Sequence, residues 1–556
     1  MANIETLPPP AEATGTYWPQ SCPDCCSNLD EVLLPLRKKF IELTAQVNSY
    51  RGLLNESRKR EENLKEQLAQ AEAKIRQLKK QAFGRKAEQG KGKPETLDKT
   101  GSTDAEKKKR GRQPGSPPPK RRRYSNLPTK EETASMTEEE SRCPDCGLPA
   151  QPFFRDEESE VIEVVVQAHI RKIKRKCYTP GCKCGVLPGV MMAPVIGALF
   201  PGSNIGVWTW MEILLAKYRY GEPINRLLNR WDDMGAGLPP GTVHSNLPRM
   251  SDLFAPLARL VEARNRKAEH WHIDETSWMV FAEMPGKVGH RWWLWVFVSQ
   301  DTVVFKLAPS RSADVVREHL GEHPSGIASV DRYSAYKAVA IRSLYFMLAY
   351  CWAHVRRDFL KVQLEWPETK DWAQSWLEMI AALYHANNLR RESEKGSDAF
   401  LEADKDVQQR IEEFRNGINK GLKDEHLHPA AQKVLNSMNE HWSGLTIFAS
   451  HPWIPMDNNT AERTLRPEVV GRKNYWGSGS LKTAQLQADL GTIFFTLEKH
   501  GVNLRTWLWE YLSDCALSGG RPPEDLEKYL PWATTQARKE RWQKPPPTEP
   551  YSDRSA

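Results

Sequence analysis

The chain has 556 residues, of which 39% are hydrophobic and 27% are charged, a composition typical of globular proteins. Its length is enough for roughly three or four domains, and a net charge of +8 is small for that length, so the position of the positive charge matters more than its total. No stretch is long and apolar enough for a membrane span, and the N-terminus has no secretory signal, so we expect a cytosolic protein. The ten cysteines then indicate metal binding rather than disulfides.

Residues 33–83 repeat apolar side chains with the alternating three- and four-residue spacing of a coiled coil. Among the core positions of this repeat only Ser57 and Glu61 are polar. We therefore predict a self-associating coiled coil, with one long solvated helix or an intramolecular hairpin as the alternative. Residues 1–32, which contain Cys22, Cys25 and Cys26, are not assigned.

Residues 84–141 are rich in Lys, Gly, Pro, Ser, Thr and Glu and are predicted to be a basic, flexible linker. The positive charge is concentrated between residues 107 and 123, where no acid occurs. Such a segment can lie along the minor groove of DNA, and the alternative is a solvated charge run. The candidate DNA-binding residues here are Lys107, Lys108, Lys109, Arg110, Arg112, Arg121, Arg122 and Arg123.

Cysteines at residues 142–190 have the spacing of a zinc ribbon. Cys143 and Cys146 form a regular Cys-x-x-Cys knuckle, and a β-rich stretch is expected after it at residues 159–176. The second knuckle is irregular. We favour Cys177 and Cys182 as its Zn²⁺ ligands, with Cys184 as a substitute for Cys182.

Residues 200–267 have helical periodicity, interrupted by a glycine turn at residues 235–237. Two helices joined by such a turn are compatible with helix-turn-helix DNA binding. They are equally compatible with an ordinary helical bundle.

From residue 268 to residue 355 the pattern changes to strands, expected at residues 270–281, 290–299, 302–307, 326–330 and 344–350. The order β-β-β-α-β-α-β is that of an RNase H-like core, a mixed five-stranded sheet flanked by helices. Asp274 lies within the first strand and Asp331 at the end of the fourth. These strands are neighbours in such a sheet, so the two carboxylates are expected to lie together.

A third carboxylate is expected from a helix that follows the fifth strand. Glu462 is the candidate, because Asp457 is a suitable N-cap that places it about one turn into a helix. Carboxylate oxygens suit Mg²⁺ or Mn²⁺, and two such ions roughly 3.5–4 Å apart would stabilise the attacking and leaving oxygens of a phosphoryl transfer. Since the chain has 71 acidic residues, only the placement of these three favours a catalytic site.

The predicted core is interrupted and then resumes. Residues 356–456 have helical spacing with several tryptophans, which predicts an α-helical insertion in which the tryptophans are packing residues. The second part of the core spans residues 457–515, and residues 516–556 are expected to be a C-terminal tail. The fold class is thus multidomain, of α+β and α/β type.

Several short motifs follow one another along the chain: H-I-D-E-T at 272–276, S-V-D-R-Y at 329–333, C-W-A-H at 351–354, D-N-N-T-A-E-R-T-L-R-P at 457–467 and G-R-K-N at 471–474. Together they resemble the transposases of bacterial insertion-sequence family sixty-six, with the motif around Glu462 as the most specific. The coiled coil, the basic segment, the cysteine ribbon and the following helices are laid out in the same way. The resemblance covers about residues 35–515.

This resemblance implies a member of the Asp-Asp-Glu superfamily with Asp274, Asp331 and Glu462 as catalytic acids. Cys351 and His354 match a Cys-x-x-His that supports the core of related transposases. Such an enzyme binds the terminal inverted repeats of its element, cleaves double-stranded DNA and joins the freed 3′ end to target DNA.

The resemblance also suggests the surroundings of the reaction. We expect Arg472 and Lys473 to hold DNA phosphates. Accessory proteins encoded by the same element are expected as further partners. The expected location is the bacterial cytoplasm, at the nucleoid. Two rival functions remain: a DNA-binding protein that has lost the chemistry, and a nuclease that cuts without joining.

Overall fold

The computed structural model describes residues 29–83, 141–142, 144–149, 166–179, 181, 190–192, 199–200, 202–284, 287 and 289–546. By their internal contacts the residues form two units: residues 1–84, 175–227 and 239–556 make the larger one, and residues 85–174 and 228–238 the smaller one. None of the described helices is both long and apolar enough to cross a lipid bilayer. The basic segment at 107–123 lies outside the described residues.

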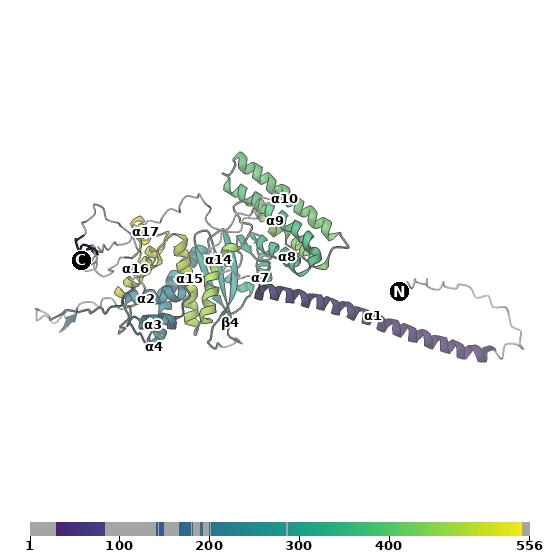
Figure 1. The fold of residues 1–556 in the computed structure, drawn as a ribbon, viewed down its shortest axis with the longest axis horizontal. Helices are drawn as coiled ribbons and strands as arrows, with labels where there is room; N and C mark the ends of the chain where they lie inside the picture. The colour runs from purple at the N-terminus through teal and green to yellow at the C-terminus, as the bar shows by residue number, and fades with distance from the viewer. Residues whose placement is uncertain are drawn as a thin grey trace. The chain divides into compact units, whose positions relative to one another are not determined.

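The predicted coiled-coil segment is one continuous helix, α1 (Leu29–Phe83), of 55 residues (Figure 1). At 1.5 Å per residue it is about 80 Å long. Its described core positions are exposed in the single chain, among them Phe40 at 73% and Leu64 at 64%. The helix is therefore confirmed, and its pairing with a second helix stays a prediction.

The cysteine-rich region contains little regular structure in its described residues. Two short strands, β1 (Cys177–Tyr178) and β2 (Met191–Met192), pair antiparallel in the larger unit. In the smaller unit Arg142 and Pro149 form an isolated bridge. The β-rich stretch expected at 159–176 was wrong for residues 166–176, which have neither helix nor strand and are exposed.

The sheet has five strands in the order β5-β4-β3-β6-β7. The pairs β3–β4 and β4–β5 are antiparallel, and the pairs β3–β6 and β6–β7 are parallel. This mixed sheet and the β-β-β-α-β-α-β order confirm the sequence prediction. The elements are β3 (His270–Met279), β4 (Arg291–Val298), β5 (Val303–Ala308), α6 (Ala313–Leu320), β6 (Gly326–Val330), α7 (Ser334–Ala340) and β7 (Phe346–Tyr350).

Helices cover both faces of this sheet. One face packs on α14 (Asn459–Tyr475) and α15 (Leu481–Lys499) through a core that includes Trp278, Val296 and Ala461. On the other face α7 contributes Tyr336, whose ring lies 6.1 Å from that of Trp295. Because side chains alternate along a strand, each face receives its own set of apolar residues.

Both edges of the sheet are covered, which removes unpaired strand groups. At the β5 edge, hydroxyl oxygens of α15 accept the backbone N–H groups: Thr496 Oγ1 from Val303 at 2.9 Å and Thr492 Oγ1 from Phe305 at 2.8 Å. At the β7 edge a short helix, α12 (Trp442–Leu445), lies so close that a Cβ on Gly444 would be 2.4 Å from the Leu348 carbonyl oxygen. Only glycine fits there.

The region before the sheet is helical, as predicted. A rare π-helical turn, η1 (Leu215–Arg219), directly continues its first helix. The other elements are α2 (Val207–Leu214), α3 (Ile224–Asp232), α4 (Pro240–Asn246), the 3₁₀ turn η2 (Leu247–Arg249) and α5 (Met250–Asn265).

The predicted insertion is also helical and has its own core, visible in green in Figure 1. Trp376 stacks on Phe359 with ring centroids 5.4 Å apart, and Trp352 packs against Phe414, so these tryptophans are packing residues as expected. The elements are α8 (Trp352–Glu365), η3 (Pro367–Thr369), α9 (Lys370–Glu392), α10 (Asp398–Leu422), α11 (Pro429–Glu440), α12 and α13 (Ile447–Ser450).

The expected C-terminal tail from residue 516 was wrong for residues 516–546. After α16 (Leu504–Leu517) the chain forms η4 (Glu527–Tyr529) and α17 (Gln536–Trp542), which pack back on α16. Tyr529 and Trp542 are fully buried, and the Trp542 indole N–H donates to Glu510 at 3.0 Å. The sequence does not predict this packing, because the aromatic residues are widely spaced in a Pro-rich stretch and follow no helical or strand period.

Candidate active site

The sheet brings Asp274 and Asp331 to neighbouring strands. In the parallel pair β3–β6, His272 lies opposite Ser329. Two residues further along each chain, Asp274 and Asp331 follow in the same register and on the same face. Glu462 lies in the first turn of α14, the helix that packs on this face of β3. The three acids expected from the sequence therefore come together from three separate elements.

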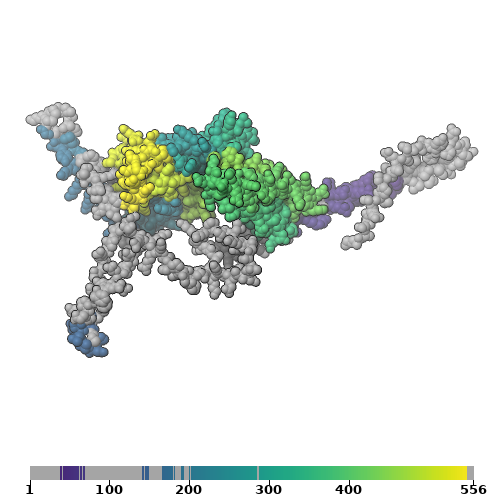
Figure 2. All heavy atoms as spheres, turned by 90° about the horizontal axis from the view of Figure 1, so that it is seen from above, coloured from purple at the N-terminus to yellow at the C-terminus, as the bar shows by residue number. Residues whose placement is uncertain are grey.

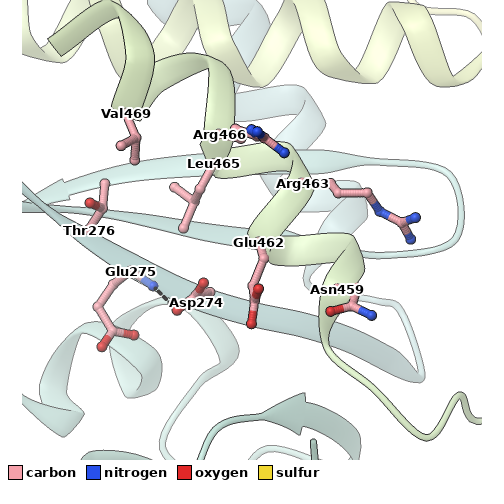
Figure 3. Close-up of a pocket in the computed structure, with 9 residues that line it drawn as sticks. All are labelled: Asp274, Glu275, Thr276, Asn459, Glu462, Arg463, Leu465, Arg466 and Val469. Atoms are coloured by element: carbon pink, nitrogen blue, oxygen red, sulfur yellow. Dashed lines mark hydrogen bonds between the residues drawn. The ribbon is translucent and has the colours of Figure 1, made fainter. Parts of the chain in front are cut away.

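The electrostatics of Asp274 show how close the acids are. Burial raises the pKa of Asp274 to about 7, and the negative charges of Glu275, Asp331 and Glu462 add to the rise. A hydrogen bond from the Glu275 backbone N–H, at 2.9 Å, opposes it (Figure 3). A carboxyl group in this state gains from any cation that binds beside it.

Glu462 is held by the insertion. Arg357 of α8 donates to Glu462 Oε1 at 2.6 Å, and His354 Nε2 lies 3.8 Å from the same oxygen. Burial and the charge of Arg357 lower the pKa of His354, while Glu462 and Asp331 oppose this. The first turn of α8 thus lies at the acids, with its basic groups directed toward them.

Asp274, Glu275 and Glu462 line a pocket of about 400 Å³ between β3 and α14 (Figure 3). Arg463 and Arg466 of α14 stand at its rim. Carboxylates below and guanidinium groups above are a pattern suited to a phosphodiester with its metal ions. The lining residues are Asp274, Glu275, Thr276, Asn459, Glu462, Arg463, Leu465, Arg466 and Val469.

The donor set fits a hard divalent cation in its chemistry, since Asp274, Asp331 and Glu462 offer carboxylate oxygens and mutual repulsion. Within the part of the chain that the structure describes, however, no three His, Cys, Asp or Glu side chains are already arranged around one ion position. Glu462 points to Arg357 instead. A metal bound through Glu462 Oε1 would compete with Arg357 for this oxygen.

Asn458 fixes the start of α14 against the sheet. Its side-chain amide donates to the Ile273 carbonyl at 2.8 Å, and its backbone N–H donates to Cys351 Sγ at 3.2 Å. Asn458 Oδ1 is then left to accept from His272 Nδ1 at 3.0 Å, which assigns the tautomer of the ring. Asn458, 2% exposed, therefore ties β3, the end of β7 and α14 together.

The expected N-cap was off by one residue. Asn458, not Asp457, occupies the N-cap position, while Asp457 Oδ1 accepts from the Asn459 backbone N–H at 3.1 Å. Glu462 still lies about one turn into the helix. Cys351, buried at 2%, contributes its sulfur to this turn, in line with a supporting role.

Arg472 does not extend into solvent for a phosphate. Its guanidinium donates to the Ser277 carbonyl and, at 3.0 Å, to Ser277 Oγ, so it joins α14 to β3. The expectation that Arg472 holds a phosphate is therefore replaced by a structural role. Lys473, next to it, is exposed as that expectation requires.

Glu275 is a residue that the sequence analysis passed over. Its carboxylate is buried and accepts hydrogen bonds from Tyr336 of α7 and from Arg311. Burial raises its pKa, against the opposing effects of these two partners. The pairing fixes β3 next to Asp274. Sequence offers only the Asp-Glu dipeptide as a signal, because both partners are distant in the chain.

The zinc ligands are only partly described. Cys146 and Cys177 are exposed and form no disulfide. Cys143, Cys182 and Cys184 lie outside the described residues, as do Lys107, Lys108, Lys109, Arg110, Arg112, Arg121, Arg122 and Arg123. The ribbon and the basic segment remain predictions.

Comparisons with known proteins point to one family. A family model described as "Transposase IS66 family" matches residues 202–486, which is about half of the chain. "Uncharacterized protein y4qI" of Sinorhizobium fredii (strain NBRC 101917 / NGR234) is 24% identical over 407 residues, 70% of this chain and 73% of that protein. "Uncharacterized protein y4hP" of the same strain is 22% identical over 431 residues, 72% of this chain and 75% of that protein. No solved structure matches the chain significantly.

Proposed function

The chain belongs to the IS66 transposase family, and we propose that it is a DNA transposase of a bacterial insertion sequence that reacts at Asp274, Asp331 and Glu462, beside the pocket that Asp274 and Glu462 line. One observation carries the assignment of the site. Asp274 of β3, Asp331 at the end of β6 and Glu462 of α14 lie close together: burial raises the pKa of Asp274 to about 7, and the negative charges of Glu275, Asp331 and Glu462 add to the rise. Strained like-charge clusters of this kind are typical of functional sites.

The fold supports the same proposal. We assign the five-stranded sheet to the RNase H-like class, because its strand order and directions are those of that class. Asp274 and Asp331 occupy adjacent strands, and Glu462 comes from a helix after the fifth strand. Residues 352–450 are then an insertion between the second and third acids.

The chemistry is phosphoryl transfer in two steps. Divalent ions held by the three carboxylates would neutralise charge on the phosphate and favour a hydroxide-like nucleophile. Water attacks the phosphorus at the element end, the bond to O3′ breaks, and the proton lost by water is matched by one gained at O3′. The 3′-hydroxyl then attacks a target phosphodiester and displaces the target O3′, so the number of phosphodiester bonds is conserved in this step.

Each residue of the pocket has its own role in this scheme. Asp274 and Asp331 would hold the ions from the sheet, and Glu462, which is now paired with Arg357, would supply the third carboxylate. Arg357, once freed, remains beside the site as a phosphate ligand. Arg463 and Arg466 at the rim orient the backbone of the DNA.

The remaining parts fit a protein that joins two DNA ends. Self-association of α1 would bring two active sites together, and the cysteine ribbon with Zn²⁺, the basic segment and the helix-turn-helix-like region would hold the inverted repeats. The DNA substrate places the reaction at the bacterial nucleoid. Accessory proteins of the same element are further partners.

A strand-transfer assay tests the proposal. The protein is incubated with Mg²⁺, labelled DNA from the ends of the region that encodes it, and a plasmid target. Joined products with a short target duplication are expected. Cleavage without joining would establish the nuclease instead, and binding without cleavage the DNA-binding protein that has lost its chemistry.

A further inference from the structure

An exposed tryptophan at the end of α14 stands in an unfavourable backbone conformation. Trp476 has φ 67°, and no other non-glycine residue among those described has positive φ. Its side chain is 75% exposed. Bulky residues avoid this left-handed region, so a tryptophan is retained there only where its surroundings force it and a function benefits.

The next two residues show what forces this conformation. Ser478 pairs with β3: its N–H donates to the Met279 carbonyl at 2.9 Å, and its own carbonyl accepts from the Phe281 N–H at 2.8 Å. A Cβ on Gly477 would lie 2.2 Å from the Met279 carbonyl oxygen, so only glycine permits this approach. The chain is thus pinned to β3 directly after Trp476, and the ring projects from a rigid base.

The Trp476 ring gains nothing from the described part of the protein in return. It makes no ring or cation–π contact with any described residue. Phe281, whose backbone N–H donates to the Ser478 carbonyl, is also exposed, at 48%. An exposed aromatic ring on a fixed backbone is an arrangement that binding sites use, because no backbone ordering is required when a partner stacks on the ring.

The exposed side of α14 before Trp476 has three cations, with Val470, 50% exposed, between them. Arg463, Arg466 and Lys473 are exposed and have no hydrogen bond or ion pair with the described residues. Their spacing of three and seven residues places them on one side of the helix. Of the two acids of α14, Glu468 is buried, and Glu462 lines the pocket beside Arg463 and Arg466, where it is already paired with Arg357. Figure 3 shows Arg463 and Arg466 leaving α14 at the pocket rim.

We propose that this face of α14 is a DNA-binding track, on which Arg463, Arg466 and Lys473 bind the phosphates and Trp476 stacks on an unpaired base. The inference rests on the proposed function and adds the path of the DNA. Fourteen residues separate Glu462 from Trp476, a helical rise of about 20 Å, so the stacked base lies about six nucleotides from the reacting phosphate. A duplex hides the faces of its bases, so only an unstacked nucleotide can use the ring.

The test of Trp476 is a comparison of two DNA probes. Full-length protein without Mg²⁺ or Mn²⁺ is titrated into a fluorescein-labelled duplex, either fully paired or with a few unpaired nucleotides in one strand, and anisotropy gives the affinity. We call the duplex with unpaired nucleotides the gapped probe. Trp476→Ala should weaken binding to the gapped probe by about tenfold and leave the affinity for the fully paired probe nearly unchanged. Trp476→Phe should restore most of the loss.

Two further variants separate stacking from folding. Trp476→Gly removes the ring and also the backbone strain, so it should melt no lower than wild type while losing the preference for the gapped probe. Tyr345→Ala, which removes an aromatic ring that is 77% exposed and distant from α14 in the sequence, should leave both affinities unchanged. Equal affinity of Trp476→Ala and wild type for the gapped probe would overturn the stacking role.

The cations have a separate readout. Each of Arg463→Gln, Arg466→Gln and Lys473→Gln should weaken both probes alike and lower the slope of log affinity against log salt by about 0.7–0.9. Lys433→Gln, an exposed lysine on the insertion, should not change the slope. An unchanged salt slope in all three variants would overturn the proposal that this face of α14 binds DNA phosphates.

The inference and the function can fail independently. If wild type joins DNA ends but Trp476→Ala binds gapped DNA normally, the function stands and the track through Trp476 is wrong. If Trp476 carries the preference for gapped DNA in a protein that never cuts, the binding face stands and the transposase is wrong.

Discussion

Asp274 in the sheet and Arg390 in the helical insertion are two charged groups buried in opposite ways. Arg390 is fully buried, but its terminal nitrogens donate to four acceptors, among them Asp404 Oδ1 at 2.7 Å and the Phe448 carbonyl at 2.6 Å. Asp274 accepts one backbone hydrogen bond and has three carboxylates for neighbours. The charge of Arg390 is therefore paired with an opposite charge inside the fold, and the charge of Asp274 is not.

The difference separates a group that holds the fold together from a group that waits for a ligand. A buried charge that is paired with an opposite charge and with carbonyl groups stabilises its surroundings only as long as those partners are present. A buried charge among like charges destabilises the fold until a cation arrives, and such sites persist because function requires them. Removing each charge should therefore have opposite effects on stability.

The largest effect on activity is expected from replacing the three candidate catalytic acids. Asp274→Ala, Asp331→Ala and Glu462→Ala should each lower cleavage and joining by about 10³-fold or more, because each removes a group that acts on the transition state. Binding of DNA should be retained. Asp314→Ala, which removes an exposed carboxylate of α6, is the matched control. Near-normal joining by any one of the three variants would show that this residue is misassigned.

The same site should become more stable when its charge is removed. Asp274→Asn keeps the shape of the side chain but ends its repulsion with Glu275, Asp331 and Glu462. In buffer without divalent ions we expect the free energy of unfolding to rise by about 1–2 kcal/mol, while activity is lost. Urea unfolding followed by circular dichroism measures this. A lower stability would mean that the carboxylate of Asp274 is compensated by the fold.

The opposite result is expected in the insertion. Arg390→Ala leaves Asp404 and two backbone carbonyls without their donor, so the insertion should lose about 3–5 kcal/mol of stability. Lys361→Ala, which removes the exposed partner of an i,i+4 ion pair with Glu365, should change stability by less than about 1 kcal/mol. Thermal melting compares the two. Similar melting temperatures of the two variants would show that the hydrogen bonds of Arg390 contribute little to the stability of the insertion.

Much of the fold was predictable because it depends on local patterns. Alternating apolar residues located β3 to β7, and the carboxyl ends of parallel strands placed Asp331 beside Asp274. The folding of residues 516–546 was missed, since burial of Tyr529 and Trp542 depends on α16 and not on any local periodicity. The β-rich stretch expected at 159–176 failed over its described residues 166–176 in the same way: Val166, Ile170 and Ile173 favour a strand, but the described residues offer them no partner strand.

The site was predictable in its acids and not in their partners. Asp274, Asp331 and Glu462 stand in short motifs, whereas Arg357, Arg311 and Tyr336 reach the site from helices and loops that no spacing rule connects. Arg472 illustrates the limit. Its position after Glu462 suggested a phosphate ligand, but the helix turns it toward Ser277, and only the tertiary structure fixes that direction.

Asn458 connects the two regions, and its removal should have an intermediate effect. Asn458→Ala loses the bonds to the Ile273 carbonyl and to His272, leaving a buried acceptor unpaired at a cost of about 2 kcal/mol. Because the start of α14 is then less well fixed, kcat should fall by about 10²-fold with little change in KM. Asn439→Ala, an exposed amide paired with Arg415, is the control. A change in stability without a change in kcat would assign Asn458 to folding alone.

Glu468 lies between the two extremes and should give the smallest effect. It is 3% exposed on the inner side of α14, where it accepts from Gln487 Nε2 at 2.6 Å. Burial raises its pKa to about 8, against the opposing effects of Arg219, Gln487 and Lys217. Lys217 in turn has its pKa lowered to about 8 by burial. Glu468 therefore has nearby cations that partly offset the cost of its burial, which Asp274 lacks. It is still destabilised in its charged form by burial, whereas the charge of Arg390 is paired with Asp404.

The direction of the pH effect follows from the proton that Glu468 holds. Between its unfolded pKa near 4.5 and its folded pKa near 8, the folded state binds a proton that the unfolded state has released, so this group lowers stability as pH rises. Glu468→Gln cannot titrate, and its amide oxygen still accepts from Gln487. Relative to wild type, the variant should gain about 1–2 kcal/mol of stability between pH 5 and pH 8, a discounted figure because Lys217 and Arg219 lie close. Glu412→Gln, an exposed carboxylate of α10, gives the reference for losing one carboxyl at the surface. A difference between Glu468→Gln and wild type that stays constant over this range would mean that Glu468 is charged in the folded protein and paired with Lys217, which would place it with Arg390 among the balanced charges.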